Sequence, residues 1–152
     1  MAQPKFKTKP GQTDYTNIRY APVINCVVRY NDKILLVRRS SDLRLYPGYW
    51  NGVSGFLDDH QGILEKVRTE LREELGIPAS KIKRVRIGQI FEMEAPKYKK
   101  TWIIHPILAD IVTSDIRLDW EAQSHEWMTL AEAKKKKTLP GFKQVLKEIE
   151  KL

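Results

Sequence analysis

Cysteine is nearly absent from the 152-residue chain, which contains only Cys26. A single cysteine excludes an internal disulfide and a cysteine-rich metal knuckle, and its place in an apolar run favours a buried thiol. The sequence also lacks any run of about 18 apolar residues, so no membrane-spanning helix is expected. Residues 1–11 are polar and show no secretory pattern. A cytoplasmic protein follows as the default.

Acidic residues are fewer than basic ones, 19 against 27, and the formal net charge is +8. A basic surface attracts phosphorylated ligands and speeds their encounter, and it could also serve RNA. Many soluble proteins are basic for solubility alone, so the charge by itself selects no partner. The length and the 41% hydrophobic content fit one domain with one core.

The pattern of strand signals divides the chain into a polar arm, residues 1–20, and a single domain, residues 21–152. Asn31 and Asp32 separate two β-rich runs and suit a tight hairpin turn. Strands are predicted at residues 22–30, 33–39, 50–53, 82–94, 102–113 and 126–128.

Helix signals alternate with these strands. The longest spans residues 62–75 and is closed by Gly76. Its apolar stripe comprises Leu64, Val67, Leu71 and Leu75. Thr129 and Glu132 have capping-box spacing, and the lysines at 134–137 are expected in that helix and the loop that follows. An amphipathic helix from Pro140 carries Phe142, Val145, Leu146 and Ile149. The order predicts an α/β fold with a mixed β-sheet sandwiched between α-helices.

Three glutamates, Glu70, Glu73 and Glu74, fall at i, i+3 and i+4 in the long helix and share one face. Each like-charge pair on a helix surface costs about 0.2–0.5 kcal/mol, and a divalent cation would remove this repulsion. Magnesium prefers carboxylate oxygens, keeps several waters and bridges to phosphates. The cluster therefore indicates half of a magnesium site. The alternative, more common for this spacing alone, is a solvated acidic face with Lys66 partly offsetting Glu70.

The wider spacing around these glutamates resembles the Nudix hydrolase family, whose box reads G-x5-E-x7-R-E-U-x-E-E-x-G-U, where U is aliphatic. Seven of the nine defined positions match, namely Gly55, Glu70, Leu71, Glu73, Glu74, Gly76 and Ile77. The flanks agree at residues 35–39 and 47–50 before the box and at residues 119–121 and 126–127 after it. The resemblance runs from residue 22 to the C-terminus and implies a Nudix fold.

This resemblance implies a role for each matching residue. Glu73 and Glu74 are expected as metal ligands, Glu70 as a ligand or the base that activates water, and the Gly55 carbonyl as a further ligand. Glu121 lies where some members place another ligand or base, although a surface loop acid is an equal alternative. The implied cofactor is Mg²⁺, with Mn²⁺ as a substitute. The implied reaction is metal-dependent hydrolysis of a diphosphate bond in a nucleoside-diphosphate-linked small molecule.

Four further residues are candidates for binding that substrate. Arg39, Arg44 and Lys100 could hold the phosphates, and Tyr98 could stack on a base from the basic loop. For each of them the alternative is an ordinary solvated or packed side chain. The expected partner is a small-molecule nucleotide rather than nucleic acid or a membrane, and a homodimer is left open.

Two box positions depart from the family pattern, with Gln61 in place of the first Glu and Thr69 in place of the Arg. In the family these two side chains support the catalytic carboxylates. Gln61 and Thr69 could form a neutral version of that support, and Asp58 or Asp59 could supply the missing acid. A catalytically weak nucleotide-binding module is therefore one alternative. An RNA 5′-end pyrophosphohydrolase, motivated by the net charge and the lysine-rich loops, is another.

Overall fold

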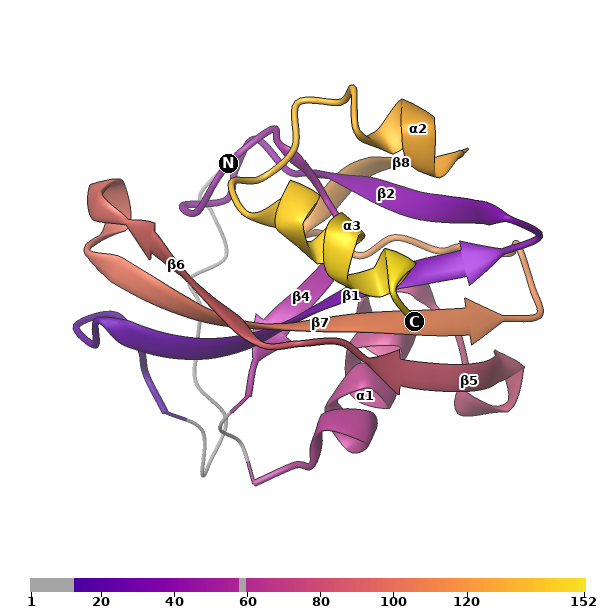
Figure 1. Ribbon diagram of the computed structural model, residues 1–152, viewed down its shortest axis with the longest axis horizontal. Coiled ribbons are helices and arrows are strands. Elements are labelled where there is room, and N and C mark those ends of the chain that lie inside the picture. Colours follow the sequence, from indigo (N-terminus) through magenta and orange to yellow (C-terminus); the bar gives the residue numbers. More distant parts are fainter. Residues whose placement is uncertain (1–12, 58–59) are drawn as a thin grey trace.

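Eight strands form one mixed β-sheet in the computed structural model, which describes residues 13–57 and 60–152. The strands are β1 (Tyr20–Tyr30), β2 (Lys33–Arg39), β3 (Trp50–Asn51), β4 (Val53–Phe56), β5 (Ile82–Ile87), β6 (Phe91–Ala95), β7 (Lys100–Ile111) and β8 (Ala122–Met128). The order is β3-β2-β1-β7-β5, with β4 paired to β1, β6 to β7 and β8 to β2. Only the β1–β7 pair among these is parallel, so the predicted mixed sheet is confirmed (Figure 1).

The hairpin between β1 and β2 forms where the sequence predicts it. Tyr30 pairs with Lys33 across the turn, and both turn residues have positive φ, 48° for Asn31 and 64° for Asp32. Asparagine and aspartate tolerate this left-handed conformation, and it gives the turn the twist that matches its flanking strands.

Alternating residues of the central strands pack into two separate cores. In β1, Ile24, Cys26 and Val28 join one core, whereas Val27 joins the other. Side chains alternate across a strand, so a central strand with both faces covered carries buried apolar residues on each face, and β1 also buries one polar residue, Asn25. Cys26 has no exposed surface, and burial raises the pKa of its thiol, which confirms the predicted buried cysteine.

Helices cover both faces of the sheet, and α1 (Ile63–Leu75) packs on one of them. Val67, Leu71 and Leu75 of this helix are buried as predicted. Gly76 ends α1 in the left-handed conformation, with φ 68°, and its N–H donates to the Arg72 carbonyl at 3.1 Å. This is the glycine-dependent helix end that the sequence predicts.

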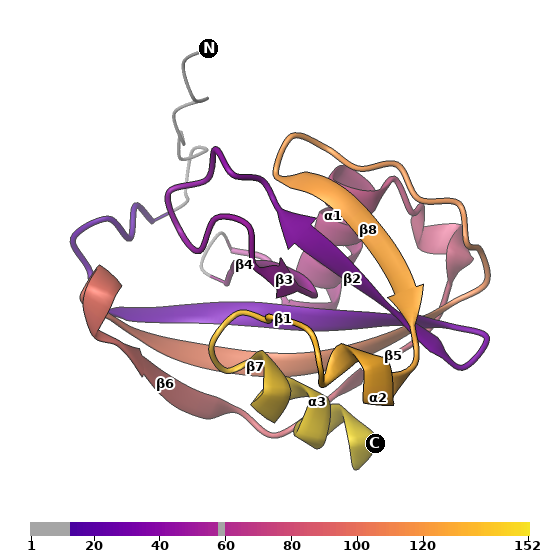
Figure 2. The ribbon, with the colours of Figure 1, turned by 90° about the horizontal axis from the view of Figure 1, so that it is seen from above.

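The opposite face carries the two C-terminal helices, α2 (Leu130–Ala133) and α3 (Phe142–Glu150). The N–H of Glu132 donates to the Thr129 hydroxyl oxygen at 3.2 Å, so the predicted cap is present. The four predicted apolar residues of α3 are all buried, namely Phe142, Val145, Leu146 and Ile149. Figure 2 shows α1 and α3 on opposite sides of β1 and β7. Across the described ranges, no helix is long and apolar enough to cross a membrane.

Several boundaries differ from the sequence-based expectation. The strand predicted at residues 82–94 is two strands, β5 and β6, which pair with successive halves of β7. The strand predicted at 50–53 is likewise two, β3 and β4, separated at Gly52, where an added Cβ would lie 2.6 Å from the Cys26 carbonyl oxygen. β8 begins at Ala122, earlier than predicted.

Three smaller features also differ from the sequence-based expectation. Leu64, expected in the apolar stripe of α1, is 45% exposed, whereas its neighbour Ile63 packs against the core in the first helical turn. The helix before residues 134–137 ends at Ala133, so these lysines follow it rather than extend it. Two short 3-10 helices, Ala79–Lys81 and Pro96–Tyr98, occupy the turns before β5 and β7. Residues 1–12 of the predicted arm lie outside the described residues.

Candidate functional site

A cavity of about 510 Å³ lies beside α1, between β4, β7, the described end of the N-terminal segment and the loop after β2. Its charged lining residues are Asp14, Arg39, Asp42, Arg44, Lys66, Glu70, Lys100 and Glu121. Its apolar wall includes Phe56, Met93, Trp102, Ile104 and Trp120. This volume falls within the range of about 300–1,000 Å³ that small-molecule sites occupy, so the cavity can hold an anionic ligand with an apolar part.

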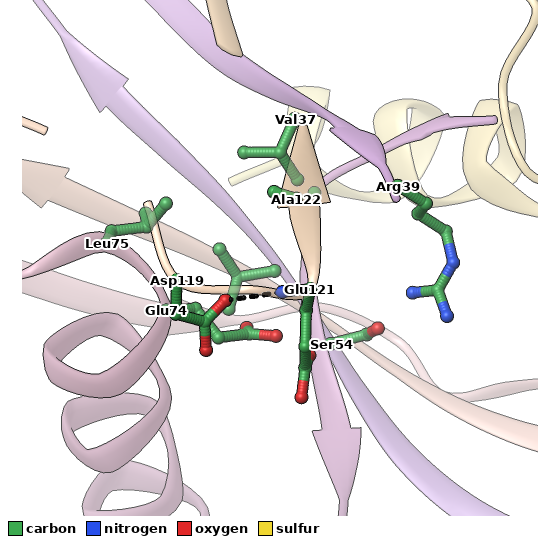
Figure 3. Close-up of a pocket in the computed structure, with 10 residues that line it drawn as sticks. Val37, Arg39, Ser54, Glu74, Leu75, Asp119, Glu121 and Ala122 are labelled. Carbon is green, nitrogen blue, oxygen red and sulfur yellow. Dashed lines mark hydrogen bonds between the residues drawn. The ribbon is translucent and has the colours of Figure 1, made fainter. Parts of the chain in front are cut away.

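A second cavity of about 20 Å³ adjoins the first and shares Arg39, Ser54 and Glu121 with it. It holds roughly one water-sized particle. Figure 3 shows Glu74, Asp119 and Glu121 gathered on one side of this small cavity, with the Arg39 side chain directed away from them. The N–H of Glu121 donates to the Asp119 carboxylate at 3.0 Å and fixes the loop before β8.

One stripe of α1 presents Lys66, Glu70 and Glu74 at successive helical turns. The neighbouring stripe, Val67, Leu71 and Leu75, is buried against the sheet. Packing of the apolar stripe therefore sets the rotation of α1. This rotation brings the charged stripe to the two cavities, because residues four apart lie on the same face of a helix.

The carboxyl of Glu74 lies in the most acidic part of the site. Burial raises its pKa well above the ordinary value, and a hydrogen bond and the charge from Glu121, followed by the charges of Glu70 and Asp119, raise it further. Its Oε2 atom is buried and has no hydrogen-bond partner. Burial and the nearby Glu121 and Glu73 charges also raise the pKa of Asp119 to about 6, against two backbone hydrogen bonds. The charges of these neighbouring acids oppose one another, and a cation among them would relieve that repulsion.

The carboxyl of Glu70 is held between β4 and its own helix. Lys66 Nζ lies 3.0 Å from Glu70 Oε1, and the two side chains are 5% and 13% exposed. On the other side, a Cβ added to Gly55 would lie 2.8 Å from the same oxygen. Burial raises the pKa of Glu70, the Lys66 ammonium lowers it, and the charges of Glu121 and Glu73 raise it again, so the net direction is upward.

Glu73 lies at the exposed margin of the cluster and lines neither cavity. Among the described residues, no group of three Asp, Glu, His or Cys side chains is placed to hold a metal ion. The donor chemistry still fits magnesium, because Glu74 offers a buried carboxylate oxygen with no partner and Glu121 lies beside it. Two carboxylates, waters and substrate phosphate oxygens are a common magnesium ligand set.

The two departures from the family box contact each other. Gln61 Nε2 donates to Thr69 Oγ1 at 3.3 Å, while Gln61 Oε1 is buried with no hydrogen-bond partner. The two neutral side chains are thus paired with each other, and their support of the catalytic carboxylates stays a prediction. Asp58 and Asp59, the alternative acids, lie outside the described residues.

Two of the predicted substrate-binding residues, Arg39 and Arg44, line the large cavity. Arg39 lines both cavities, and its Nε donates to the Leu45 carbonyl at 3.0 Å. Burial lowers the pKa of Arg39, partly offset by the charges of Glu121 and Glu74. Arg44 is exposed at the cavity margin. Both are therefore placed to meet an anionic ligand.

The structure gives the other two, Lys100 and Tyr98, mainly structural contacts. Lys100 lines the cavity, but its buried ammonium donates to the carbonyls of Tyr15 and Ile18 and so anchors the segment before β1. Tyr98 does not line the cavity. Its hydroxyl accepts the Tyr46 N–H at 2.9 Å, and the two rings meet edge to face. Each of these contacts joins segments distant in sequence, which the local pattern does not show, and substrate binding by Lys100 and Tyr98 stays a prediction.

Two residues of the site have a larger part in the structure than the sequence indicates. The sequence pattern lets Lys66 offset Glu70 on a solvated face, yet its phase with Glu70 and Glu74 on the helix could have indicated a buried charge. Asp119 belongs to a family-like flank in the sequence, and in the structure it lies in the acidic cluster. Trp120 of the same flank is 49% exposed and lines the large cavity. An exposed tryptophan beside a predicted ligand, Glu121, is a signal for a binding surface that composition alone does not give.

Fold and site together define a protein with a mixed-sheet α/β core and an acidic helix beside a small-molecule cavity. Comparison with known families assigns the class, since the NUDIX domain family model matches residues 19–149. The chain belongs to the NUDIX family, and the family expected from the glutamate spacing is confirmed.

Solved structures of this family have the same fold. A MutT NUDIX hydrolase from Burkholderia pseudomallei superposes with a TM-score of 0.74 at 17% identity, covering 86% of this chain and 98% of that one. A MutT protein from Methanosarcina mazei Go1 gives 0.72 at 24% identity, covering 89% and 96%. An isopentenyl-diphosphate Delta-isomerase from Haloarcula marismortui is 35% identical over 63 residues, 41% of this chain and 34% of the isomerase. The match thus spans about a third of that relative's length.

Proposed function

We propose that this chain hydrolyses the diphosphate bond of a nucleoside-diphosphate-linked small molecule, with Mg²⁺ or Mn²⁺ as cofactor. The observation that carries the proposal is the cavity of about 510 Å³ in which Glu70 and Glu121 face the same space as Arg39 and Arg44. A diphosphate carries dense negative charge, and a site that holds it needs cations on one side and a base on the other.

The acidic residues divide the remaining roles. Glu74 and Glu121, with Glu73 from the exposed margin and the Gly55 carbonyl, would hold the metal, and Glu70 would serve as a ligand or general base. The bound metal would screen the phosphate charge and lower the pKa of water. Glu121 would also orient the substrate, because it lines both cavities. Arg39 would contact phosphate oxygens from the opposite wall.

The apolar wall would receive the group attached to the diphosphate. Phe56 and Trp102 lie with their rings 6.2 Å apart, and Trp120 is half exposed at the cavity margin. Aromatic faces accept nucleobases by stacking with little dependence on the base. A wall of this kind would also accept the apolar tail of an isoprenoid diphosphate, so such a compound belongs among the substrates to be tested.

The test is product release from a panel of nucleoside triphosphates, nucleotide sugars, dinucleoside polyphosphates and isopentenyl diphosphate, with magnesium and the purified chain. Glu70→Gln and Glu74→Gln are expected to lower kcat/KM by about 100-fold or more, in the range of general-base losses. Glu65→Gln, an exposed glutamate on the same helix, is the matched control and should retain activity. Equal turnover in all four proteins would refute the proposal.

A second candidate is a binding module that holds the same ligand without cleaving it. Two contacts favour this candidate. Gln61 and Thr69 form an uncharged pair where the family has a charged one, and the charge of Glu70 is paired with the Lys66 ammonium. Ligand-dependent thermal stabilisation with no product after long incubation would support this candidate. An RNA 5′-end activity would instead require cleavage of a triphosphate-ended RNA and binding that weakens steeply with salt.

A further inference from the structure

Lys66 is a buried lysine inside the acidic cluster. It is 4% exposed, although lysine is almost never fully buried unless it is paired. Its Nζ lies 3.0 Å from Glu70 Oε1, and it lines the cavity of about 510 Å³ together with Glu70. A charged side chain in this place meets any ligand that enters the acidic end of the cavity.

The Glu70 oxygen that contacts Lys66 also faces β4. Gly55 approaches from β4 so closely that an added Cβ would lie 2.8 Å from Oε1. A magnesium ion on that oxygen would lie about 2.1 Å away, and therefore at most about 5 Å from Lys66 Nζ. A double and a single positive charge at that separation repel each other. The ammonium and a divalent ion thus compete for the Glu70 oxygen.

The two box positions that usually carry charge are neutral in this chain. Gln61 and Thr69 contact each other at 3.3 Å and bring no positive charge to Glu70. The positive charge instead comes from Lys66, one helical turn before Glu70. Its position follows from the packing of α1, because Val67 and Leu71 beside it are fully buried.

We propose that Lys66 is a resident cation, whose ammonium takes the place at Glu70 that a divalent ion would otherwise fill. This inference rests on the proposed function, because it concerns the same diphosphate site. It assigns the divalent metal to Glu74, Glu121 and Glu73, and of the two roles open to Glu70 it leaves that of general base, paired with the protein's own cation. Lys66 is thereby a positioning residue, since it acts through Glu70 and reduces by one the ions that the acidic cluster takes up.

The test counts bound Mn²⁺ per chain by the loss of the free-ion electron paramagnetic resonance signal. Lys66→Met removes the charge and keeps most of the stem, and it should bind one more Mn²⁺ per chain than the wild type. Lys66→Arg keeps the charge and should bind the wild-type number. Arg68→Met, which removes one positive charge from the exposed face of the same helix, is the matched control and should also be unchanged.

A second measurement uses inorganic diphosphate as the ligand. At low Mn²⁺, Lys66→Met should bind diphosphate about tenfold more weakly than wild type, a ratio equal to about 1.4 kcal/mol. At high Mn²⁺ its affinity should return, because the extra ion replaces the lost ammonium. Lys66→Arg should show neither change. The rescue by metal separates a cationic role from a packing role, since lost packing would weaken binding at every metal concentration.

The outcomes decide the proposal even when the variant is unstable. If Lys66→Met melts early without metal, Mn²⁺ should raise its melting temperature more than it raises that of the wild type. An unchanged Mn²⁺ count, or a melting temperature that Mn²⁺ does not restore, overturns the proposal. The count needs no turnover. A wild-type chain that cleaves none of the tested diphosphates would therefore refute the proposed hydrolysis without deciding the role of Lys66.

Discussion

Gly55→Ala tests whether the close approach of β4 to Glu70 matters for catalysis. The new Cβ would lie 2.8 Å from Glu70 Oε1 and 2.9 Å from its Cδ, whereas ordinary contact begins at 3.4 Å. The carboxyl must therefore withdraw by about 0.6 Å, and the cavity that Glu70 lines gives its flexible end room to do so. The main-chain carbonyl of residue 55 remains in the variant, so the change acts through the Glu70 side chain.

The expected loss follows from this displacement. A misplacement of about 1 Å in a reacting group can lower the rate by about 100-fold, so a shift of about 0.6 Å should lower kcat/KM by about 10- to 100-fold. Stability should change by less than about 1 kcal/mol, because a flexible side-chain end moves and alanine restricts the unfolded chain more than glycine does. In Gly55→Ala, kcat/KM is thus expected to fall while the free energy of unfolding stays nearly unchanged.

The assay compares kcat/KM on the best substrate of the panel with the free energy of unfolding in urea. Gly62→Ala is the control, because an added Cβ at Gly62 has no heavy atom within 4 Å. This control should keep kcat/KM within about twofold of wild type, as expected for a substitution away from contacts. Wild-type kcat/KM in Gly55→Ala would refute the argument that the position of Glu70 depends on this glycine.

Two further predictions concern stability. Phe142→Ala removes a fully buried ring of α3 and should cost about 3–5 kcal/mol in urea unfolding, whereas the exposed Lys143→Ala should stay within about 0.5 kcal/mol. Burial raises the pKa of Asp110, but the hydrogen bonds and charges of Arg29 and Arg86 outweigh it, so the folded-state pKa is lowered. Its stabilising contribution is therefore present above about pH 4 and lost as the pH falls further. Asp110→Asn should flatten that acid loss in a pH series of unfolding free energies, and a curve parallel to wild type would contradict this.

Most of the fold could be predicted from local sequence patterns. The spacing of Val67, Leu71 and Leu75 marks the buried face of α1, and Gly76 marks its end. Apolar alternation of this kind reflects forces that act within a few residues, so it can be recognised without tertiary information. The same spacing places Glu70 and Glu74 on one stripe, and the structure brings both to the small-molecule site.

The missed features depend on contacts between distant segments. The break between β5 and β6 lies at Gly88, whose N–H donates to the Pro106 carbonyl on β7 at 2.8 Å. Tyr98 contacts Tyr46, 52 positions away, rather than the cavity. Lys100 binds carbonyls of the segment before β1. Strand breaks and side-chain partners of this kind are set by the sheet edge that a segment meets, and the local sequence does not specify that edge.

The parallel pairing of β1 with β7 has a consequence for synthesis on the ribosome. Arg29 and Asp110, joined at 2.7 Å across this pair, are 81 positions apart. The apolar β1 strand therefore leaves the exit tunnel long before its central partner exists, and closure of such a long loop slows folding. Until β7 emerges, the nascent chain presents one edge of β1 unpaired. Chaperone demand during translation should accordingly fall once residues 100–111 have been released.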